Sequence, residues 1–446
     1  MSTQDNPWVE DGDIKNASWT THTNLIKKLP DILRTLGTIA LLVAMYSFLA
    51  KGWQSGNDVF RYLMMLGHTS ALAIIGLASG HWLKEGKGAR LLMALALVSV
   101  PANFAILGAF IFSQTAAIDI SHYPNYVAWT VDSLNTALLT SGGAMLLLIP
   151  ITLLGFTVLA RSMSKKLSLL FLCSNAALLL PLRDPQLIGL LVLSLAFLSI
   201  FLSRKASRNK LAAKTREGVI ALGLQLLPLA VLMGRSLWLY SFDLFLFTVL
   251  SITVFFVLRQ TSTYLEQDSR WHGLTNVLSI IPAMAVAPLL SVTLIDVFHF
   301  AIALAFPVGA LVSAALIYDI SNRSATRASL YRHLAAAVLL LTMITNLMMF
   351  TSLMATLTCI VIGISVAVFG YNKQQRSVFA SGFVLTLTGI GQQFYEIFHH
   401  FDLGSWASLA VLGVASIVIA STIESQGGKI KPRIDDLKNR LNEWEK

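Results

Sequence analysis

The sequence predicts an all-α fold, a polytopic membrane helix bundle of about 14 transmembrane helices with both termini cytoplasmic. Composition is the first reason, because 55% of the 446 residues are hydrophobic and only 13% are charged. Soluble domains carry about 25% charged residues. A chain with so few charges could not cover its surface in water, whereas lipid solvates an apolar exterior. The composition therefore excludes a water-soluble enzyme.

The second reason is a series of apolar segments along the whole chain. About 20 apolar residues in a helix cross the hydrocarbon core, with roughly 17 to 25 observed. Segments 167–182 and 354–370 are short, and such a pair could be re-entrant instead of spanning. The predicted spans are 36–53, 60–83, 90–113, 137–160, 167–182, 186–203, 218–236, 242–258, 274–294, 297–318, 333–352, 354–370, 377–400 and 406–423.

The third reason is the distribution of charge between these segments. All but four of the 33 Lys and Arg residues fall in every second inter-span region, the exceptions being Lys51, Arg61, Arg183 and Arg235. Basic residues concentrate in cytoplasmic loops, so the rich side is predicted to be cytoplasmic. The unbroken alternation indicates an even number of spans. It also explains the net charge of +10 without a nucleic-acid partner.

The sequence predicts three regions in the chain. The N-terminal arm contains several acidic residues and no early apolar core, so it is not expected to be a cleaved signal peptide. Near the C-terminus, Ile434, Leu437, Leu441 and Trp444 recur at helical spacing and predict a short amphipathic helix. Residues 429–446 could dock a protein partner, or pack on the membrane surface or on cytoplasmic loops. The regions are a cytoplasmic arm 1–35, a transmembrane bundle 36–423 and a cytoplasmic amphipathic helix 424–446.

The predicted outer loops are short except residues 114–136. This loop carries Tyr123, Tyr126 and Trp129 but no Lys or Arg. Aromatic side chains favour the headgroup layer, so an ordinary interfacial re-entry is the simpler expectation. A lid over a site on the outer face is the alternative.

Two carboxylate–imidazole pairs, Asp296 with His299 and Glu396 with His399, are spaced i, i+3 and fall on the predicted outer side. This spacing would put each pair on one helix face. Such pairs from two helices build metal centres in helix bundles, and they could equally relay protons. Solvated interfacial residues are the third interpretation, and no cofactor is expected. The candidate ion, proton or metal site comprises Asp296, His299, Glu396, His399, His400 and Asp243.

Neutral polar side chains fall deeper within the spans. They could line a substrate path, or they could form hydrogen bonds between helices, which is the commoner role. Gly76 and Gly80 form a GxxxG motif that permits close helix approach. Pro228 and other prolines within spans are expected to kink them. The candidate path-lining residues are His68, Asn103, Gln225, Asn346, Gln392 and Gln393.

The sequence contains none of the common catalytic motifs that would indicate an enzyme. The sequence contains no Walker A, HExxH, GxSxG or CxxCH motif. Its two cysteines, Cys173 and Cys359, each lie in an apolar run and are expected to be buried.

Both ends of the bundle contain recognisable patterns. Residues 36–113 run from Leu36-Gly37-Thr38 through Lys51-Gly52-Trp53 to a basic turn and a span rich in small residues. Residues 371–424 contain Gln-Phe-Tyr-Glu at 393–396 and Leu-Ala-Val-Leu-Gly at 409–413. Together these stretches resemble bacterial polytopic inner-membrane proteins catalogued as domains of unknown function. The resemblance implies a bacterial inner membrane, and it transfers no catalytic residue.

The expected function is transport or translocation of a small or amphipathic solute, or an accessory role in it. Span number, kinking prolines and the lack of a soluble catalytic domain favour it. The alternatives are a structural or assembly subunit of a membrane complex, and a periplasm-facing metal or proton-relay site. A polar cavity at mid-membrane would favour transport, and a packed interior would favour scaffolding.

Overall fold

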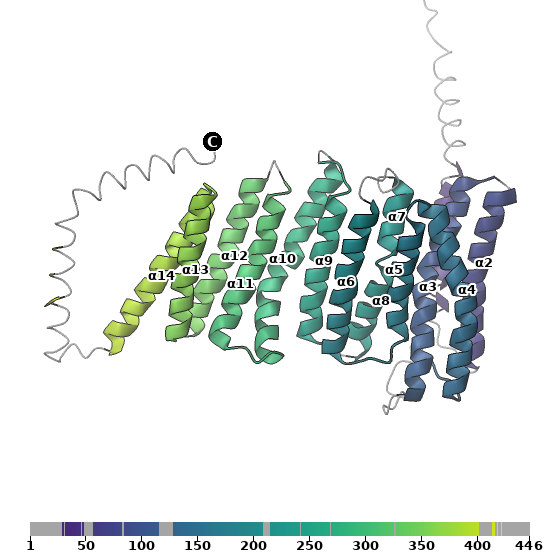
Figure 1. The fold of residues 1–446 in the computed structure, drawn as a ribbon, viewed down its shortest axis with the longest axis horizontal. Helices are drawn as coiled ribbons and strands as arrows, with labels where there is room; N and C mark the ends of the chain where they lie inside the picture. Colours follow the sequence, from purple (N-terminus) through teal and green to yellow (C-terminus); the bar gives the residue numbers. More distant parts are fainter. Residues whose placement is uncertain are drawn as a thin grey trace, which may run out of the picture. The chain divides into compact units, whose positions relative to one another are not determined.

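The computed structural model describes residues 29–30, 32–45, 47–48, 57–82, 84–115, 128–207, 215–240, 242–267, 269–324, 327–350 and 352–400, with residues 413, 414, 417 and 421. All regular secondary structure in these ranges is helical, which confirms the all-α class (Figure 1). Ten of the described helices are long and apolar enough to cross a membrane. The number of about 14 spans and the cytoplasmic termini stay predictions.

The chain divides into two compact units. The first unit comprises Met1–Arg183 with Leu195–Arg235, and the second comprises Asp184–Ser194 with Ser236–Lys446. The dividing line passes through helix α6, Pro185–Ser207, so this helix contributes to both units.

The first unit is organised around one buried helix. An apolar helix, Ile32–Met45, precedes its numbered helices. Helix α3 contacts α2, α4, α5, α7 and α8, and Met93, Leu97 and Phe110 along it are fully buried. It is therefore the core of the unit. The numbered helices are α2 (Asp58–Trp82), α3 (Gly86–Thr115), α4 (Leu134–Ala160), α5 (Ser164–Leu179), α7 (Arg216–Leu224) and α8 (Leu227–Arg235).

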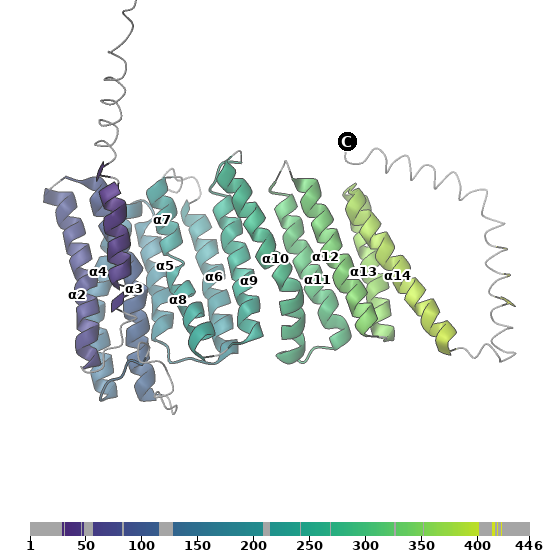
Figure 2. The ribbon, with the colours of Figure 1, turned by 180° about the vertical axis from the view of Figure 1, so that it is seen from behind.

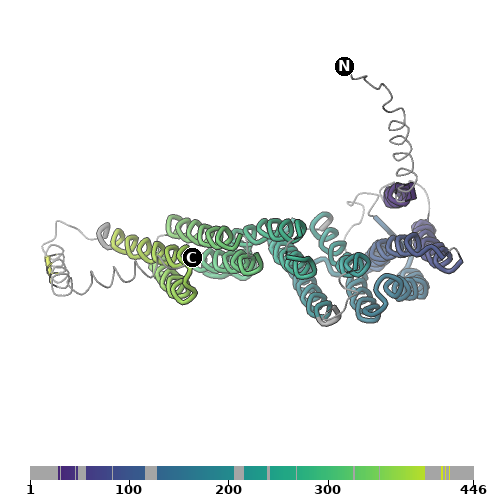
Figure 3. Tube along the Cα trace, turned by 90° about the horizontal axis from the view of Figure 1, so that it is seen from above, coloured from purple at the N-terminus to yellow at the C-terminus, as the bar shows by residue number. Residues whose placement is uncertain are grey.

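The second unit is a series of neighbouring hairpins with no such central helix. Contacts join α9 to α10, α10 to α11, α11 to α12 and α13 to α14, and α14 also packs on α12. Figures 2 and 3 show these helices following one another from behind and from above. Its helices are α9 (Leu244–Ser262), α10 (Arg270–Asp296), α11 (Ile302–Ser321), α12 (Ala328–Met349), α13 (Leu353–Asn372) and α14 (Arg376–His400).

Because the helices of these hairpins are antiparallel, turns in the second unit gather at two ends. The turns that follow α9, α11 and α13 lie at one end, which we call the basic end because Arg323, Arg327 and Lys373 are there. The turns that follow α10 and α12 lie at the opposite end. This arrangement agrees with the alternation of charge in the sequence.

The predicted span 218–236 is interrupted in the structure. Helix α7 ends at Leu224, α8 begins at Leu227, and a π-helical turn, Ser236–Tyr240, follows α8. Pro228 cannot donate a backbone hydrogen bond, which accounts for the break just before it. The prediction that Pro228 distorts its span is confirmed.

The two short predicted spans differ. Helix α13 extends to 20 residues, from Leu353 to Asn372, and is among the helices that could cross a membrane. Helix α5 has only 16 residues, which is short for a span.

Glycine permits close approach at two helix pairs. A side chain at Gly76 or Gly80 on α2 would press on Ala89 of α3, so this GxxxG motif does face a neighbouring helix. In the second unit, Gly370 lies against the backbone of Phe379, and Gly382 against that of Ala367. Helices α13 and α14 are therefore in backbone contact along their length.

Candidate functional site

The first carboxylate–imidazole pair does not share a helix face. Helix α10 continues to Asp296 and ends there, and α11 begins only at Ile302. His299 lies in the intervening turn with a left-handed φ of 48°. Both side chains are exposed. The predicted start of a span at 297 was wrong because α10 reaches farther than its apolar run.

The second pair lies at the end of α14. The half-buried Glu396 accepts a weak hydrogen bond from Gln392 Nε2, at 3.4 Å. The side chains of His399 and His400 lie outside the described part of the structure. Among the described residues, no group of three His, Cys, Asp or Glu side chains could hold a metal ion. The metal and proton-relay interpretations stay predictions.

Asp243 has a structural role that its sequence position did not reveal. Its carboxylate caps α9, accepting hydrogen bonds from the backbone N–H groups of Phe245 at 2.7 Å and Leu246 at 3.4 Å. A capping carboxylate satisfies helix donors that have no other partner. These bonds are sufficient reason for an acid at this position.

Three of the candidate path-lining residues form contacts between helices. Asn103 Nδ2 on α3 donates to Thr69 Oγ1 on α2 at 2.9 Å. Gln225 Oε1, at the α7–α8 break, accepts from Ser203 Oγ on α6 at 2.7 Å. Asn346 Nδ2 on α12 donates to the carbonyl of Ala303 on α11 at 3.3 Å. These buried contacts support a role in helix association.

The other three path-lining candidates do not form such contacts between helices among the described residues. His68 is half-buried on α2, and Gln392 and Gln393 are half-buried near the end of α14. The six residues belong to several helices of both units, and their role in lining a path stays a prediction. The expectation for the cysteines is confirmed for Cys359 but wrong for Cys173, which is exposed on the apolar surface of α5.

A buried arginine near the start of α2 was missed as a site. Arg61 is only 3% exposed. It forms an ion pair with Asp58 at 3.1 Å and lies 4.0 Å from the centre of the Trp129 ring. Asp58 also accepts a hydrogen bond from the backbone N–H of Thr130 at 2.8 Å. This cluster fastens residues 128–133 to α2. The i, i+3 spacing of Asp58 and Arg61 was the available sequence signal.

The cluster bears on the long outer loop. Trp129 is 5% exposed and contacts Arg61 on α2 and Phe110 on α3, so the described end of this loop packs against these two helices. Residues 116–127 lie outside the described residues, and the lid alternative stays a prediction.

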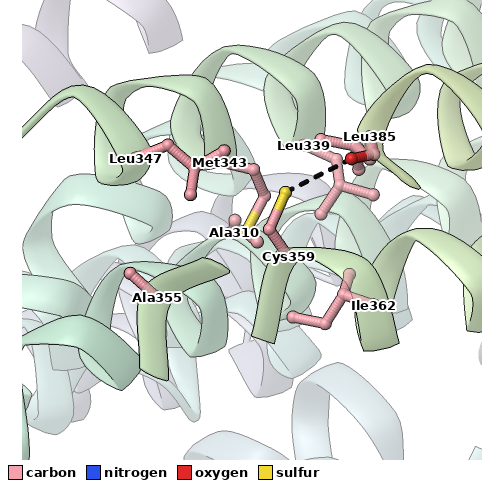
Figure 4. Close-up of a cluster of buried hydrophobic side chains, with 8 residues drawn as sticks. All are labelled: Ala310, Leu339, Met343, Leu347, Ala355, Cys359, Ile362 and Leu385. Carbon is pink, nitrogen blue, oxygen red and sulfur yellow. Dashed lines mark hydrogen bonds between the residues drawn. The ribbon is translucent and has the colours of Figure 1, made fainter. Parts of the chain in front are cut away.

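A cluster of buried apolar side chains lies between α11, α12, α13 and α14 (Figure 4). Cys359 lies within it, its thiol directed at the carbonyl of Leu385 at 3.5 Å. The core lies toward the end opposite the basic end. Its buried members are Ala310, Leu339, Met343, Leu347, Ala355, Cys359, Ile362 and Leu385.

The same four helices also line a cavity, which lies nearer the basic end than this core. It has a volume of about 260 Å³ and is almost wholly apolar. Leu339 belongs to both the core and the cavity, so packing gives way to empty space as the helices run toward the basic end. We call this the apolar cavity. It is lined by Leu311, Ala314, Ala315, Tyr318, Ala335, Ala336, Leu339, Val366, Phe369, Val378 and Ser381.

The apolar cavity has one open side and one polar end. Its lining residues Leu311, Ala315 and Phe369 are exposed on the outer surface of the helices, so the cavity opens sideways, where lipid would lie. Toward the basic end, Tyr318 packs its ring on Phe369, and its hydroxyl accepts a hydrogen bond from Gln375 Nε2 at 2.9 Å. The cavity thus has an apolar body and one polar end.

A second cavity lies at the basic end, between the start of α10 and the α11–α12 turn. Its volume is about 590 Å³. Arginine is its commonest lining residue, and we call it the arginine cavity. It is lined by Gln267, Ser269, Arg270, His272, Gly273, Leu274, Val277, Arg323, Ser324, Arg327 and Tyr331.

An ionic cluster adjoins this cavity. The Asp319 carboxylate receives two bonds from Arg259, from Nε at 2.7 Å and from a terminal nitrogen at 2.9 Å. Arg323 Nε also lies 3.2 Å from the same carboxylate. Two arginines therefore share one carboxylate, which leaves an excess positive charge.

The chain was compared with protein-family models, with curated proteins and with solved structures, and none of the three comparisons gave a match.

Proposed function

We propose that this multi-spanning membrane protein binds an amphipathic solute in the apolar cavity and translocates it. The apolar cavity is the observation that carries the proposal. A cavity of about 150 Å³ lined by apolar side chains holds benzene in a soluble protein. The cavity between α11 and α14, at about 260 Å³, is large enough for a longer apolar group such as part of an acyl chain.

The surroundings of the apolar cavity support an amphipathic rather than a hydrophilic solute. Its lining offers few polar partners, so a bound ion or sugar would lose hydration without compensation. Asn103, Gln225 and Asn346 each form a hydrogen bond between helices, and none of them lines the apolar cavity. The sideways opening would admit a molecule already dissolved in the bilayer, and the Tyr318–Gln375 pair would meet its polar part.

The binding step can be tested by photolabelling. We expect decanol bearing a diazirine to label α11 and α13 of the full-length protein in detergent, and excess unlabelled decanol to compete. Ala336 lines the cavity, whereas the next residue, Ala337, is exposed. Ala336→Phe should abolish competable labelling, and Ala337→Phe should preserve it. Equal labelling of the two variants would contradict binding in this cavity.

The translocation step needs a separate measurement. The protein would be reconstituted into phosphatidylcholine vesicles containing a fluorescent short-chain lipid, and dithionite would bleach the outer leaflet. We expect the protein to expose inner-leaflet probe to bleaching, and Ala336→Phe but not Ala337→Phe to prevent it. Competable labelling without exchange would leave a binding protein and overturn translocation of this probe.

We also place the protein in a bacterial inner membrane with both termini cytoplasmic. The alternation of basic loops supports this orientation, and the gathering of basic turns at one end of the second unit is consistent with it. Cysteines introduced one at a time at the exposed positions Asn322 and His299, in a Cys173→Ser background that keeps the buried Cys359, should react from the inside and the outside, respectively, with a membrane-impermeant maleimide. The reverse labelling would contradict it.

A further inference from the structure

We propose that the arginine cavity binds the phosphate of an anionic phospholipid. The proposal does not depend on the function proposed above, because the two cavities share no lining residue. Its volume of about 590 Å³ lies within the range of roughly 300–1,000 Å³ that is typical of small-molecule sites.

The charge of the lining favours an anion. Its described residues include three arginines and no carboxylate. Arg270 and Arg327 are exposed and form no ion pair with any described residue. Arg323 is 13% exposed in its side chain, and one of its terminal nitrogens is buried with no hydrogen-bond partner among the described residues. A guanidinium group pairs well with a phosphate, so the exposed Arg270 and Arg327 would contact it directly and Arg323 would add to the positive charge.

Two helices also begin at this cavity. Arg270 is the first residue of α10, and Arg327 is the N-cap of α12. The α12 N-cap makes no side-chain capping bond, so the first N–H groups of α12 lack that partner. Backbone N–H groups and the helix dipole at such termini favour anions, which adds to the attraction of the three arginines.

An apolar surface adjoining the arginines selects a lipid over a soluble phosphate. Leu274 and Val277 line the cavity and are 46% and 38% exposed, one and two turns along α10 from Arg270. Acyl chains attached to a phosphate held at the arginines would cover this surface. Basic pockets between helices on the cytoplasmic side bind anionic headgroups in other membrane proteins, and the basic end is predicted to face that side.

The test measures how much lipid the full-length protein retains. The protein would be purified in mild detergent after incubation with an equal mixture of phosphatidylglycerol and phosphatidylcholine, and the retained lipids quantified by mass spectrometry. We expect wild-type protein to retain phosphatidylglycerol preferentially. Arg270→Gln with Arg327→Gln should reduce this preference by about tenfold, since both direct charges are lost.

Two further variants separate a specific site from general electrostatics. Arg161→Gln with Lys165→Gln removes the same charge from two exposed positions of the first unit, in the α4–α5 turn and at the start of α5, and should leave the preference unchanged. Gly273→Leu keeps every charge but places a side chain in the cavity, where no atom lies within 4 Å of the new Cβ. It should reduce retention without lowering the unfolding temperature.

Three outcomes would overturn the proposal. Unchanged preference in the Arg270→Gln, Arg327→Gln protein would remove the role of the arginines, and an equal loss in the Arg161→Gln, Lys165→Gln protein would indicate nonspecific charge attraction. Displacement of phosphatidylglycerol by millimolar glycerol phosphate would indicate a soluble phosphate compound as the ligand. Photolabelling of the apolar cavity with decanol provides an independent readout, so failure of either proposal can be distinguished.

Discussion

The first unit surrounds one buried helix, whereas the second unit sets its helices in a series. In the first, α3 contacts five other helices and its side chains fill the interior. In the second, each helix contacts mainly its sequence neighbours, and both cavities lie there. A central helix supplies side chains from every side, but neighbouring hairpins leave space where two pairs diverge. We infer that the first unit serves stability and the second serves binding.

The largest loss of stability is expected from a substitution that disrupts the packing around α3. A Cβ at Gly108 would overlap the carbonyl oxygen of Leu178 on α5, and backbone cannot move aside as a side chain can. Gly108→Ala should lower the free energy of unfolding by about 3 kcal/mol or more. Gly142→Ala on α4 is the control, because no atom lies within 4 Å of its new Cβ. Thermal unfolding in detergent measures both, and equal melting temperatures would contradict the close α3–α5 contact.

The next effect tests the buried ion pair of the first unit. Asp58→Asn leaves the charge of Arg61 almost fully buried without a counter-charge, which should cost about 3 kcal/mol. Hydrogen exchange should increase at residues 128–133, because Asp58 also holds Thr130. The exposed Asp132 gives a matched control, Asp132→Asn. Protection that stays unchanged in Asp58→Asn would show that this segment does not depend on the pair.

The corresponding change in the second unit should be smaller. Asp319→Asn removes the carboxylate partner of Arg259 and Arg323, but the Arg259 side chain is 30% exposed and water can solvate it, whereas Arg323 is 13% exposed. We expect a loss of about 1–2 kcal/mol. Glu266→Gln, at an exposed turn position, is the control. A loss greater than that of Asp58→Asn would reverse the proposed contrast between a buried and a hydrated cluster.

The smallest effect concerns a single hydrogen bond between helices. Thr69→Val removes the acceptor for Asn103 Nδ2 while keeping the side-chain shape, and should cost about 0.6 kcal/mol. Thr152→Val is closely matched, because Thr152 is equally buried and also bonds to the carbonyl four residues earlier, but it makes no hydrogen bond to another helix among the described residues. If the two variants unfold at the same denaturant concentration, the Asn103 bond contributes nothing measurable.

Sequence reasoning located most helices because membrane spans are marked by composition. The span predicted at 137–160 is α4, Leu134–Ala160, and that predicted at 377–400 is α14, Arg376–His400. The ends of helices near the interface could not be predicted from composition, because polar residues there are compatible with either a helix or a turn. Asp296 and His299 show this, since a left-handed turn separates them into different elements.

The sites could not be predicted in the same way, because they depend on contacts between distant segments. Arg61 was recognisable as an unusual charge, but its partner Trp129 lies in another part of the chain. The apolar cavity is lined by alanines, leucines and aromatic residues that are indistinguishable in sequence from those of the filled core beside it. Only the positions of four helices separate the two.

The backbone contact between α13 and α14 constrains how the apolar cavity can change its volume. Gly370 and Gly382 leave no space for a side chain between these helices, so a shift of one helix against the other would meet backbone atoms. A solute larger than the cavity would have to separate this hairpin from α11 and α12, which would stretch the Tyr318–Gln375 hydrogen bond at the basic end. For such a solute, entry and rupture of that bond would be the same event.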